Sequence, residues 1–514
     1  MNPLIPLFVV TPLAGAFLIM ITGRFLKEFD KYLTSLILLF LVIISFYSLS
    51  TTGENLSIYK VGGWEPIDKV PIGIYMVMDG FNAIIVCIIN LIGFLSALYS
   101  ISYIKRYTAG NYFYALFCLM IGGMNGVVLS GDLFNIFVFL EISVISSYAL
   151  VAFGVEKNEL EASFKYQVLG GLASFLILFG IGFVYWKTKT LNIADIKEVF
   201  SNGYDKTYYL FVQILILSGF GLKAAIIPFH AWLPDAHSSA PSPISAMLSG
   251  VFIKAVGIYV ILRLFFNMFV VSEGMSILIT TMGTLSMVIG VFLAIGQWDI
   301  KRLLAYHSIS QMGYVVLSVG IGMILISRGS KPEVAALAIV GGIFHLINHA
   351  AFKGLLFLNA GAIEYTTGTR NLKEMGGLAR LMPVTSATSF IASMSISGVP
   401  PFNGFFSKLI IIIAAIMAKF YLLAALAVVV SIITLASFLK FQRYAFYNKS
   451  DTIDNDNKKF KEVPFPMAFS MIVLSILCVL LSLLAIPDVR HTILTPAVNI
   501  LMDQLKYTST IIGQ

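Results

Sequence analysis

Residues 211–234 read FVQILILSGFGLKAAIIPFHAWLP, an apolar run with a lysine near its centre that then meets two prolines. A run of about 20 apolar residues is long enough to cross a bilayer as a helix. Pro228 cannot donate a helical hydrogen bond, and lipid does not tolerate an exposed break in a helix. The stretch therefore predicts a membrane helix that is broken inside the protein, with Lys223 one short turn before the break.

The rest of the chain is equally apolar. Of its 514 residues, 58% are hydrophobic and only 12% are charged, with a net charge of +8. A soluble surface needs about 25–35% charged residues, so the solvent of this chain is lipid. We expect an all-α integral membrane protein of about fourteen spans. They lie near 3–23, 31–51, 79–103, 112–130, 133–154, 163–186, 208–230, 243–268, 275–297, 301–326, 334–362, 384–418, 420–446 and 464–486.

Several classes of function do not fit this composition. No interval between spans is long enough for a nucleotide-binding or redox domain, so we expect no cofactor. The three cysteines (Cys87, Cys118 and Cys478) each stand alone in an apolar segment, which argues against metal clusters and disulfides. The basic residues are scattered over short loops, which fits membrane topology better than nucleic-acid binding. The hydrophilic stretch Asn448 to Lys461 is expected to be a solvated loop.

A second span is broken in the same way as the first. Residues 398–405 read GVPPFNGF, so Pro400 and Pro401 interrupt an apolar run. Each break contains Pro-Phe, two residues and then an aromatic residue. Paired breaks in two halves of a chain indicate an internal repeat with the transport site at the breaks. Two unrelated helix kinks remain the alternative.

Three charged residues lie inside apolar runs, where each charge is costly. Glu141 stands in FVFLEISVI, Lys223 precedes the first break, and Lys254 stands in GVFIKAVG. A structural ion pair of Glu141 with Lys223 is one explanation, but it leaves Lys254 unexplained. Burial disfavours the charged form of a lysine, so a lysine whose acidic partner moves away becomes a proton switch.

The segment HLINHAAFK places His345, His349 and Lys353 four residues apart on one helical stripe. A zinc protease helix would need a glutamate after the first histidine, and position 346 is leucine. Purely structural histidines are the alternative to a proton relay, and two histidines with a lysine on one membrane helix favour the relay.

Lys408 follows the second break, and the analogy with Lys223 predicts a role in the same pathway. Snorkelling of Lys408 to the membrane interface is the alternative. The remaining charged residues near span ends are interpreted as interface anchors or residues at the mouth of a pathway: Asp79, Asp132, Arg263, His307 and Lys440.

The string from Lys223 to Ala246, KAAIIPFHAWLPDAHSSAPSPISA, resembles the signature of the antiporter-like membrane subunits of Mrp cation/proton antiporters, respiratory complex I and membrane-bound hydrogenases. The resemblance extends over nearly the whole chain. It implies a set of proton-translocating residues: Glu141, Lys223, Lys254, His345, His349 and Lys408. It also implies breaks at Pro228, Pro400 and Pro401, and supporting roles for His230, Asp235, His237 and Lys353, with no metal site.

The resemblance further implies an organisation of the chain. It comprises an N-terminal three-helix region (1–111), two inverted five-helix repeats (112–268 and 275–447), and a last helix with a tail (464–514). Only about 28 residues follow the last expected span, so the long lateral helix of the distal complex I subunit is not expected. A subunit similar to the Mrp D type, or its counterpart in a hydrogenase-like complex, fits best.

The function implied is proton translocation within a multisubunit complex of the cell membrane, with other membrane subunits, lipid, protons and, as an open option, Na⁺ as partners. No nucleic acid and no catalytic site in this chain are expected. Two alternatives remain: a quinone-binding subunit of an NADH or ferredoxin oxidoreductase, and an autonomous small-solute transporter.

Overall fold

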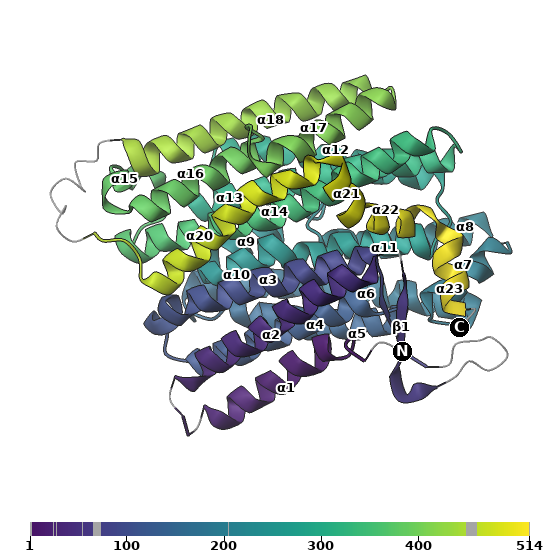
Figure 1. Ribbon diagram of the computed structural model, residues 1–514, viewed down its shortest axis with the longest axis horizontal. Helices are drawn as coiled ribbons and strands as arrows, with labels where there is room; N and C mark the ends of the chain where they lie inside the picture. Colours follow the sequence, from purple (N-terminus) through teal and green to yellow (C-terminus); the bar gives the residue numbers. More distant parts are fainter. Residues whose placement is uncertain are drawn as a thin grey trace.

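A computed structural model describes residues 3–23, 25–26, 28–53, 55–64, 73–203, 205–448 and 460–512, without the side chains of 504–506. Long helices run side by side through the molecule (Figure 1). The earlier helices lie on one side of this bundle and the later ones on the other. Helix α20 (Phe465–Leu480) runs obliquely over the bundle and packs on helices of both sides. Most of the expected hydrophilic loop, residues 449–459, lies outside the described residues.

The N-terminal region contains three long helices and a small hairpin. The helices are α1 (Leu7–Thr22), α2 (Phe29–Thr52) and α3 (Gly80–Tyr103). Between α2 and α3, β1 (Ser57–Lys60) pairs antiparallel with β2 (Tyr75–Met78), with Ser57 opposite Met78. This two-stranded sheet is a departure from the all-α expectation, although the molecule is otherwise helical.

The next part of the chain contains the first break. Its elements are α4 (Gly110–Leu129), α5 (Leu133–Val151), α6 (Lys157–Thr188), α7 (Ile193–Ser201), α8 (Lys206–Lys223), α9 (Trp232–Ser239), α10 (Ser242–Met247), η3 (Leu248–Phe252), η4 (Lys254–Ile258) and α11 (Tyr259–Asn267). Two features were not predicted. A short helix, α7, stands where a loop was expected, and η3 and η4 are π-helical turns inside the expected eighth span.

The second break lies in the following part. Its elements are α12 (Glu273–Ile295), α13 (Ile300–Ser327), α14 (Pro332–Thr367), η5 (Leu372–Glu374), α15 (Leu378–Leu381), α16 (Pro383–Ser397), α17 (Asn403–Met417), α18 (Tyr421–Gln442) and η6 (Arg443–Tyr447). After α20 come η7 (Leu481–Ala485), α21 (Pro487–Ile493), α22 (Thr495–Met502) and α23 (Gln504–Ile512). The short 3-10 turns η1 (Val61–Gly63) and η2 (Ile104–Arg106) lie earlier in the chain.

Within the described ranges, 11 helices are long and apolar enough to cross a membrane, and α1 and α17 are shorter apolar helices. The chain is thus a multi-pass membrane protein, while the number fourteen stays a prediction. Helix packing relies on small residues, as expected where lipid removes the hydrophobic drive between helices. A Cβ at Gly313 of α13 would collide with the backbone nitrogen of Met287 on α12, so only glycine allows this approach.

One local arrangement occurs twice. Asp132 caps the start of α5 and bridges Asn192, and Asp299 caps the start of α13 and bridges Asn371. Each asparagine ends a Thr-x-Thr-x-Asn motif, at 188–192 and at 367–371. In both motifs the first threonine hydroxyl donates to the carbonyl of the second threonine, at 3.1 and 3.2 Å.

Candidate functional site

The first break is only partly buried, because Ala224 to Ile227 are buried whereas Pro228 and Ala231 are exposed, so the expectation of a break inside the protein holds only for its first part. Helix α8 ends at Lys223 and α9 begins at Trp232, with a cis peptide bond between Ile227 and Pro228. A helix end leaves carbonyl groups without intrahelical partners. The Trp232 indole donates to the Leu222 carbonyl at 2.9 Å, and the Ile227 amide donates to the Ser286 hydroxyl of α12 at 2.9 Å. Neighbouring elements therefore satisfy the backbone groups that the break frees.

The second break uses a lysine for the same purpose. Helix α16 ends at Ser397, the Pro400–Pro401 bond is cis, and α17 begins at Asn403. Lys408 Nζ donates to the Ile396 carbonyl at 2.8 Å and to the Ser431 hydroxyl at 3.3 Å. Lys408 is only 3% exposed, so the alternative that it snorkels to the interface is wrong.

Glu141 and Lys223 lie on either side of a serine. Ser174 of α6 donates to Glu141 Oε1 at 2.5 Å and accepts from Lys223 Nζ at 3.0 Å. Lys223 also donates to the Gly170 carbonyl at 2.9 Å. The two charged groups form no direct ion pair, so that explanation of their burial is wrong as stated. Sequence reasoning missed Ser174, because a lone serine in an apolar span carries no signal of its own.

Lys254 lies in the π-helical part of its span and is 1% exposed. Its ammonium donates to the Ser249 carbonyl at 2.7 Å and to the Gly250 carbonyl at 2.5 Å. No carboxylate pairs with it among the described residues. π-turns inside helices occur frequently at functional sites.

The segment that carries Lys254 packs between the end of α8 and the middle of α14. A Cβ at Gly257 would lie 2.6 Å from Ala224 Cα, directly after Lys223. On the other side, a Cβ at Gly250 would lie 3.4 Å from the Ala350 carbonyl of α14. Lys254 is thus placed between the first break and the histidine helix.

The predicted stripe on α14 is fully buried. His345 Nδ1 lies 3.0 Å from the Ser407 hydroxyl, and its Nε2 lies 3.1 Å from Gln311 Oε1. Neither ring nitrogen of His349 has a hydrogen-bond partner in the described part of the chain. Lys353 donates to the Leu304 carbonyl at 2.5 Å. Because Ser407 precedes Lys408, His345 connects α14 to the second break.

The other supporting residues separate into two environments. His237 is fully buried, packs against the Phe357 ring at 4.9 Å, and has no hydrogen-bond partner among the described residues. His230 is half-buried at the first break. Asp235 is at the surface, where it pairs with Arg302 at 2.7 Å and with Lys165 at 3.2 Å. Asp235 is therefore apart from the buried line.

Some residues interpreted as interface anchors are buried instead. Asp79 and Arg263 form an ion pair at 2.7 Å, and each side chain is 2% exposed. His307 is fully buried, with Nε2 at 2.8 Å from the Ser437 hydroxyl. As interface anchors these three residues were interpreted wrongly, because their partners come from distant spans; a place at the mouth of a pathway stays a prediction. Lys440, by contrast, donates to the Ile295 and Gln297 carbonyls at the end of α12.

A buried pair at one helix end was missed altogether. Lys301 of α13, 1% exposed, lies 3.1 Å from the Glu364 carboxylate of α14 and donates to the Ala240 carbonyl at 3.0 Å. The Tyr103 hydroxyl lies 3.4 Å from the same carboxylate. The signal that could have found this pair is the acidic residue near the end of an apolar helix.

Within the described ranges, no group of three or more His, Cys, Asp or Glu side chains gathers as a metal site would require. The residues singled out for proton transfer occupy three places. Glu141 and Lys223 are joined through Ser174, and His345 lies beside the second break with Lys408. Lys254 stands by itself between them. His349 lies one turn from His345 on α14.

Comparison with known proteins confirms the resemblance. The family model described as NADH:quinone oxidoreductase/Mrp antiporter, TM, matches residues 130–434, more than half of the chain. The D-type component of the Na(+)/H(+) antiporter of Alkalihalophilus pseudofirmus is 33% identical over 471 residues, covering 91% of this chain and 92% of that protein.

Two solved structures share the fold over almost their full lengths. A chain of the Mrp complex from Dietzia sp. DQ12-45-1b superposes with a TM-score of 0.86 at 27% identity, covering 99% of both chains. A chain of an archaeal membrane-bound sulfane sulfur reductase superposes with a TM-score of 0.88 at 29% identity, covering 99% of this chain and 100% of that one. This protein therefore belongs to the NADH:quinone oxidoreductase/Mrp antiporter transmembrane family.

Proposed function

We propose that the chain translocates protons as one subunit of a multisubunit complex in the cell membrane, either an Mrp-type Na⁺/H⁺ antiporter or a redox-driven relative. The observation that carries this proposal is a set of five buried basic residues: Lys223, Lys254, His345, His349 and Lys408. Among the described residues, Glu141 is the one carboxylate linked to this set, through the Ser174 hydroxyl. Ionisable groups inside a membrane are rare and mark proton or ion pathways.

The two halves are proposed to be inverted repeats, 112–268 and 275–447, between the N-terminal region 1–111 and the last part 464–514. The duplicated Asp and Thr-x-Thr-x-Asn arrangement supports this division. Asn192 follows the end of α6, whereas the Ser239 hydroxyl donates to the Asn158 carbonyl at its start. Asp235 pairs with Arg302, and both lie near the start of α6. Asp299 is three residues before Arg302, so the arrangement at Asp299 lies near the start of α6, whereas the arrangement at Asn192 lies at its end. The two ends are about 45 Å apart in a helix of this length, which supports opposite membrane faces for the two copies.

The first step of the proposed mechanism is a change at Glu141. This residue is half-buried, and its neighbours on the same face of α5, Val138 and Ile145, are 40% and 61% exposed. A charge on an adjacent subunit can therefore act on the Glu141 carboxylate. Once that carboxylate is drawn from Ser174, Lys223 loses the field that stabilises its charged form and releases its proton.

The later steps lead through the centre to the second break. Lys254 accepts the proton, His349 exchanges it through its unpaired ring nitrogens, and His345 passes it by Ser407 to Lys408. Moving one charge against 100 mV costs about 2.3 kcal/mol, so the driving energy comes from a partner subunit or an opposing ion gradient.

The test is ion translocation by the whole assembly in inverted membrane vesicles. We expect Lys223→Ala and Lys408→Ala to abolish translocation while the complex still assembles, because each removes a group that carries the proton. Glu198→Gln, at an exposed position on α7, serves as the control and should retain the parental rate. Normal translocation in both lysine variants would show that these lysines are structural and that the pathway is wrong.

A further inference from the structure

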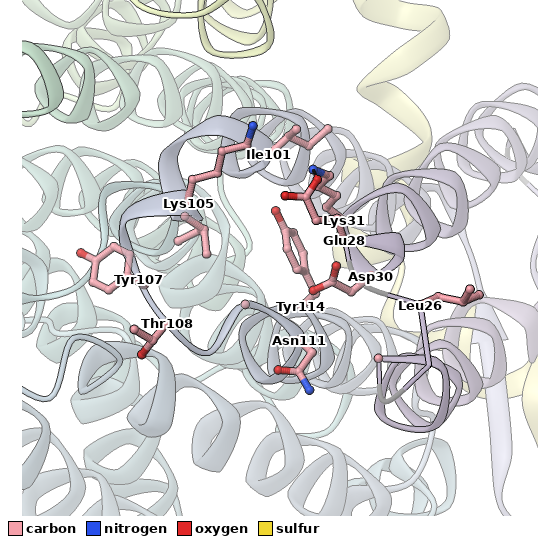
Figure 2. Close-up of a pocket in the computed structure, with 13 residues that line it drawn as sticks. Leu26, Glu28, Asp30, Lys31, Ile101, Lys105, Tyr107, Thr108, Asn111 and Tyr114 are labelled. Carbon is pink, nitrogen blue, oxygen red and sulfur yellow. Dashed lines mark hydrogen bonds and ion pairs between the residues drawn. The ribbon is translucent and has the colours of Figure 1, made fainter.

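A polar cavity of about 560 Å³ opens among the N-terminal helices, apart from the proposed pathway. It lies where α1 ends, α2 begins, α3 ends and α4 begins, so it is at a membrane–water boundary. Figure 2 shows Asp30, Tyr114 and the Glu28–Lys31 pair on one side of the opening and Lys105 on the other.

The charges of this cavity are unequally satisfied. Lys31 and Glu28 pair at 2.6 Å. Asp30 is only 8% exposed. Lys31, beside it, pairs with Glu28 instead, and among the described residues that line the cavity none is seen to donate to the Asp30 carboxylate (Figure 2). Because Asp30 lines the open cavity and has no ion-pair partner among the described residues, a cation that enters the cavity from outside the chain would be stabilised by this carboxylate. Lys105 lies exposed at the rim without an ion-pair partner among the described residues.

The cavity is also open to the apolar surface of the bundle. Leu26 lines it and is 53% exposed, while the adjacent Phe25 is 80% exposed. Tyr32, one turn into α2, is 59% exposed. Ligand cavities for small molecules measure about 300–1,000 Å³, so this one has room for a charged headgroup while apolar chains follow the outer face.

We propose that this cavity binds the headgroup of a phospholipid that carries a primary ammonium group, as ethanolamine phospholipids do. The ammonium donates hydrogen bonds to the Asp30 carboxylate, and the phosphate lies toward Lys105. A trimethylated choline headgroup has the same charge but no N–H group, so it cannot make the bond to Asp30.

The experiment uses the whole complex, purified in detergent and depleted of lipid. Its thermal unfolding and its retained lipids, counted by native mass spectrometry, are compared after adding ethanolamine or choline phospholipid with the same acyl chains. We expect the parent to retain the ethanolamine lipid about tenfold better, as one hydrogen bond to a charged group implies. Equal retention of the two lipids would overturn the proposal.

Two variants and one control sharpen the test. Asp30→Asn should remove the preference for ethanolamine, whereas Glu198→Gln should keep it. Lys105→Gln, at an exposed position that does not endanger folding, should weaken retention of both lipids. An unchanged preference in Asp30→Asn overturns the proposal, as does stabilisation by Na⁺ alone that Asp30→Asn abolishes. Stabilisation by chain-free glycerophosphoethanolamine equal to that by the lipid would assign the cavity to a soluble headgroup and overturn the lipid assignment.

Discussion

The breaks at Pro228 and at Pro400–Pro401 share one backbone arrangement but surround their lysines differently. Lys223 is bonded through Ser174 to a carboxylate, Glu141. Lys408 donates only to neutral oxygens, those of Ile396 and Ser431. A nearby carboxylate favours the charged form of a lysine, so the proton affinity of Lys223 changes when that carboxylate moves. Lys408 has only neutral acceptors, so its charge changes mainly when a proton is delivered or removed. The comparison suggests that the first half senses the driving force and the second half delivers the proton.

Among changes to the groups around the two lysines, the largest effect is expected at the Glu141 carboxylate. Glu141→Gln keeps the shape of the side chain and removes its charge, so Lys223 loses its electrostatic control. Translocation should fall about 100-fold, within the range for a positioned proton-transfer group. The rate of acidification in inverted vesicles measures this, and a rate close to that of the parent would refute the sensing role of the first half.

A smaller effect is expected when the link between the two charges is removed. Ser174→Ala leaves Glu141 and Lys223 in place but deletes the hydroxyl that joins them. We expect about a tenfold loss of translocation, equivalent to one hydrogen bond with a charged group. Ser174→Thr keeps the hydroxyl and should restore most of the rate. Equal losses in both variants would point to packing on α6 as the cause.

The corresponding change in the second half should matter less. Ser431→Ala removes one neutral acceptor of Lys408, which keeps its bond to the Ile396 carbonyl. Translocation should fall by no more than about threefold, near the lower limit of what a hydrogen bond contributes, because this bond is long at 3.3 Å and the Ile396 carbonyl still accepts from the ammonium. If this variant loses as much as Ser174→Ala in the same vesicle assay, the proposed difference between the halves does not exist.

The smallest effect concerns stability in the short helix α7, which the second half lacks at its matching motif. Burial lowers the pKa of Lys197 to about 8, although its ammonium donates to the Phe269 carbonyl. The folded state bears the cost of the buried charge below pH 8, and that cost disappears as the pH rises from 8 toward 10.5. The unfolding temperature of the parent should therefore rise by about 1–2 °C relative to Lys197→Met over this interval. Parallel curves for the two proteins would contradict the prediction.

Most of the long apolar helices and both breaks could be read from the sequence, because apolar length and proline act locally. The buried charges were also recognisable one by one, since any charge in an apolar run is conspicuous. Their partners were not. Asp79 and Arg263 are 184 residues apart, and the sequence placed both near span ends, where a role as interface anchors or at the mouth of a pathway was expected.

Local geometry set a second limit. The π-helical turns around Lys254 and the short helix α7 stand in segments that read as an ordinary span and as a loop. Both depend on packing against neighbouring helices, which no local pattern encodes.

By itself, the sequence determined that this is a multi-pass helical membrane protein with two broken helices and a set of buried lysines and histidines, because hydrophobicity, proline and charge act within a single span. Only the tertiary structure decided how these groups connect: that a serine of α6 joins Glu141 to Lys223, and that Lys408 replaces the lost helical bonds at the second break. Hydrogen bonds have a short range and a strict direction, so they depend on how distant helices pack.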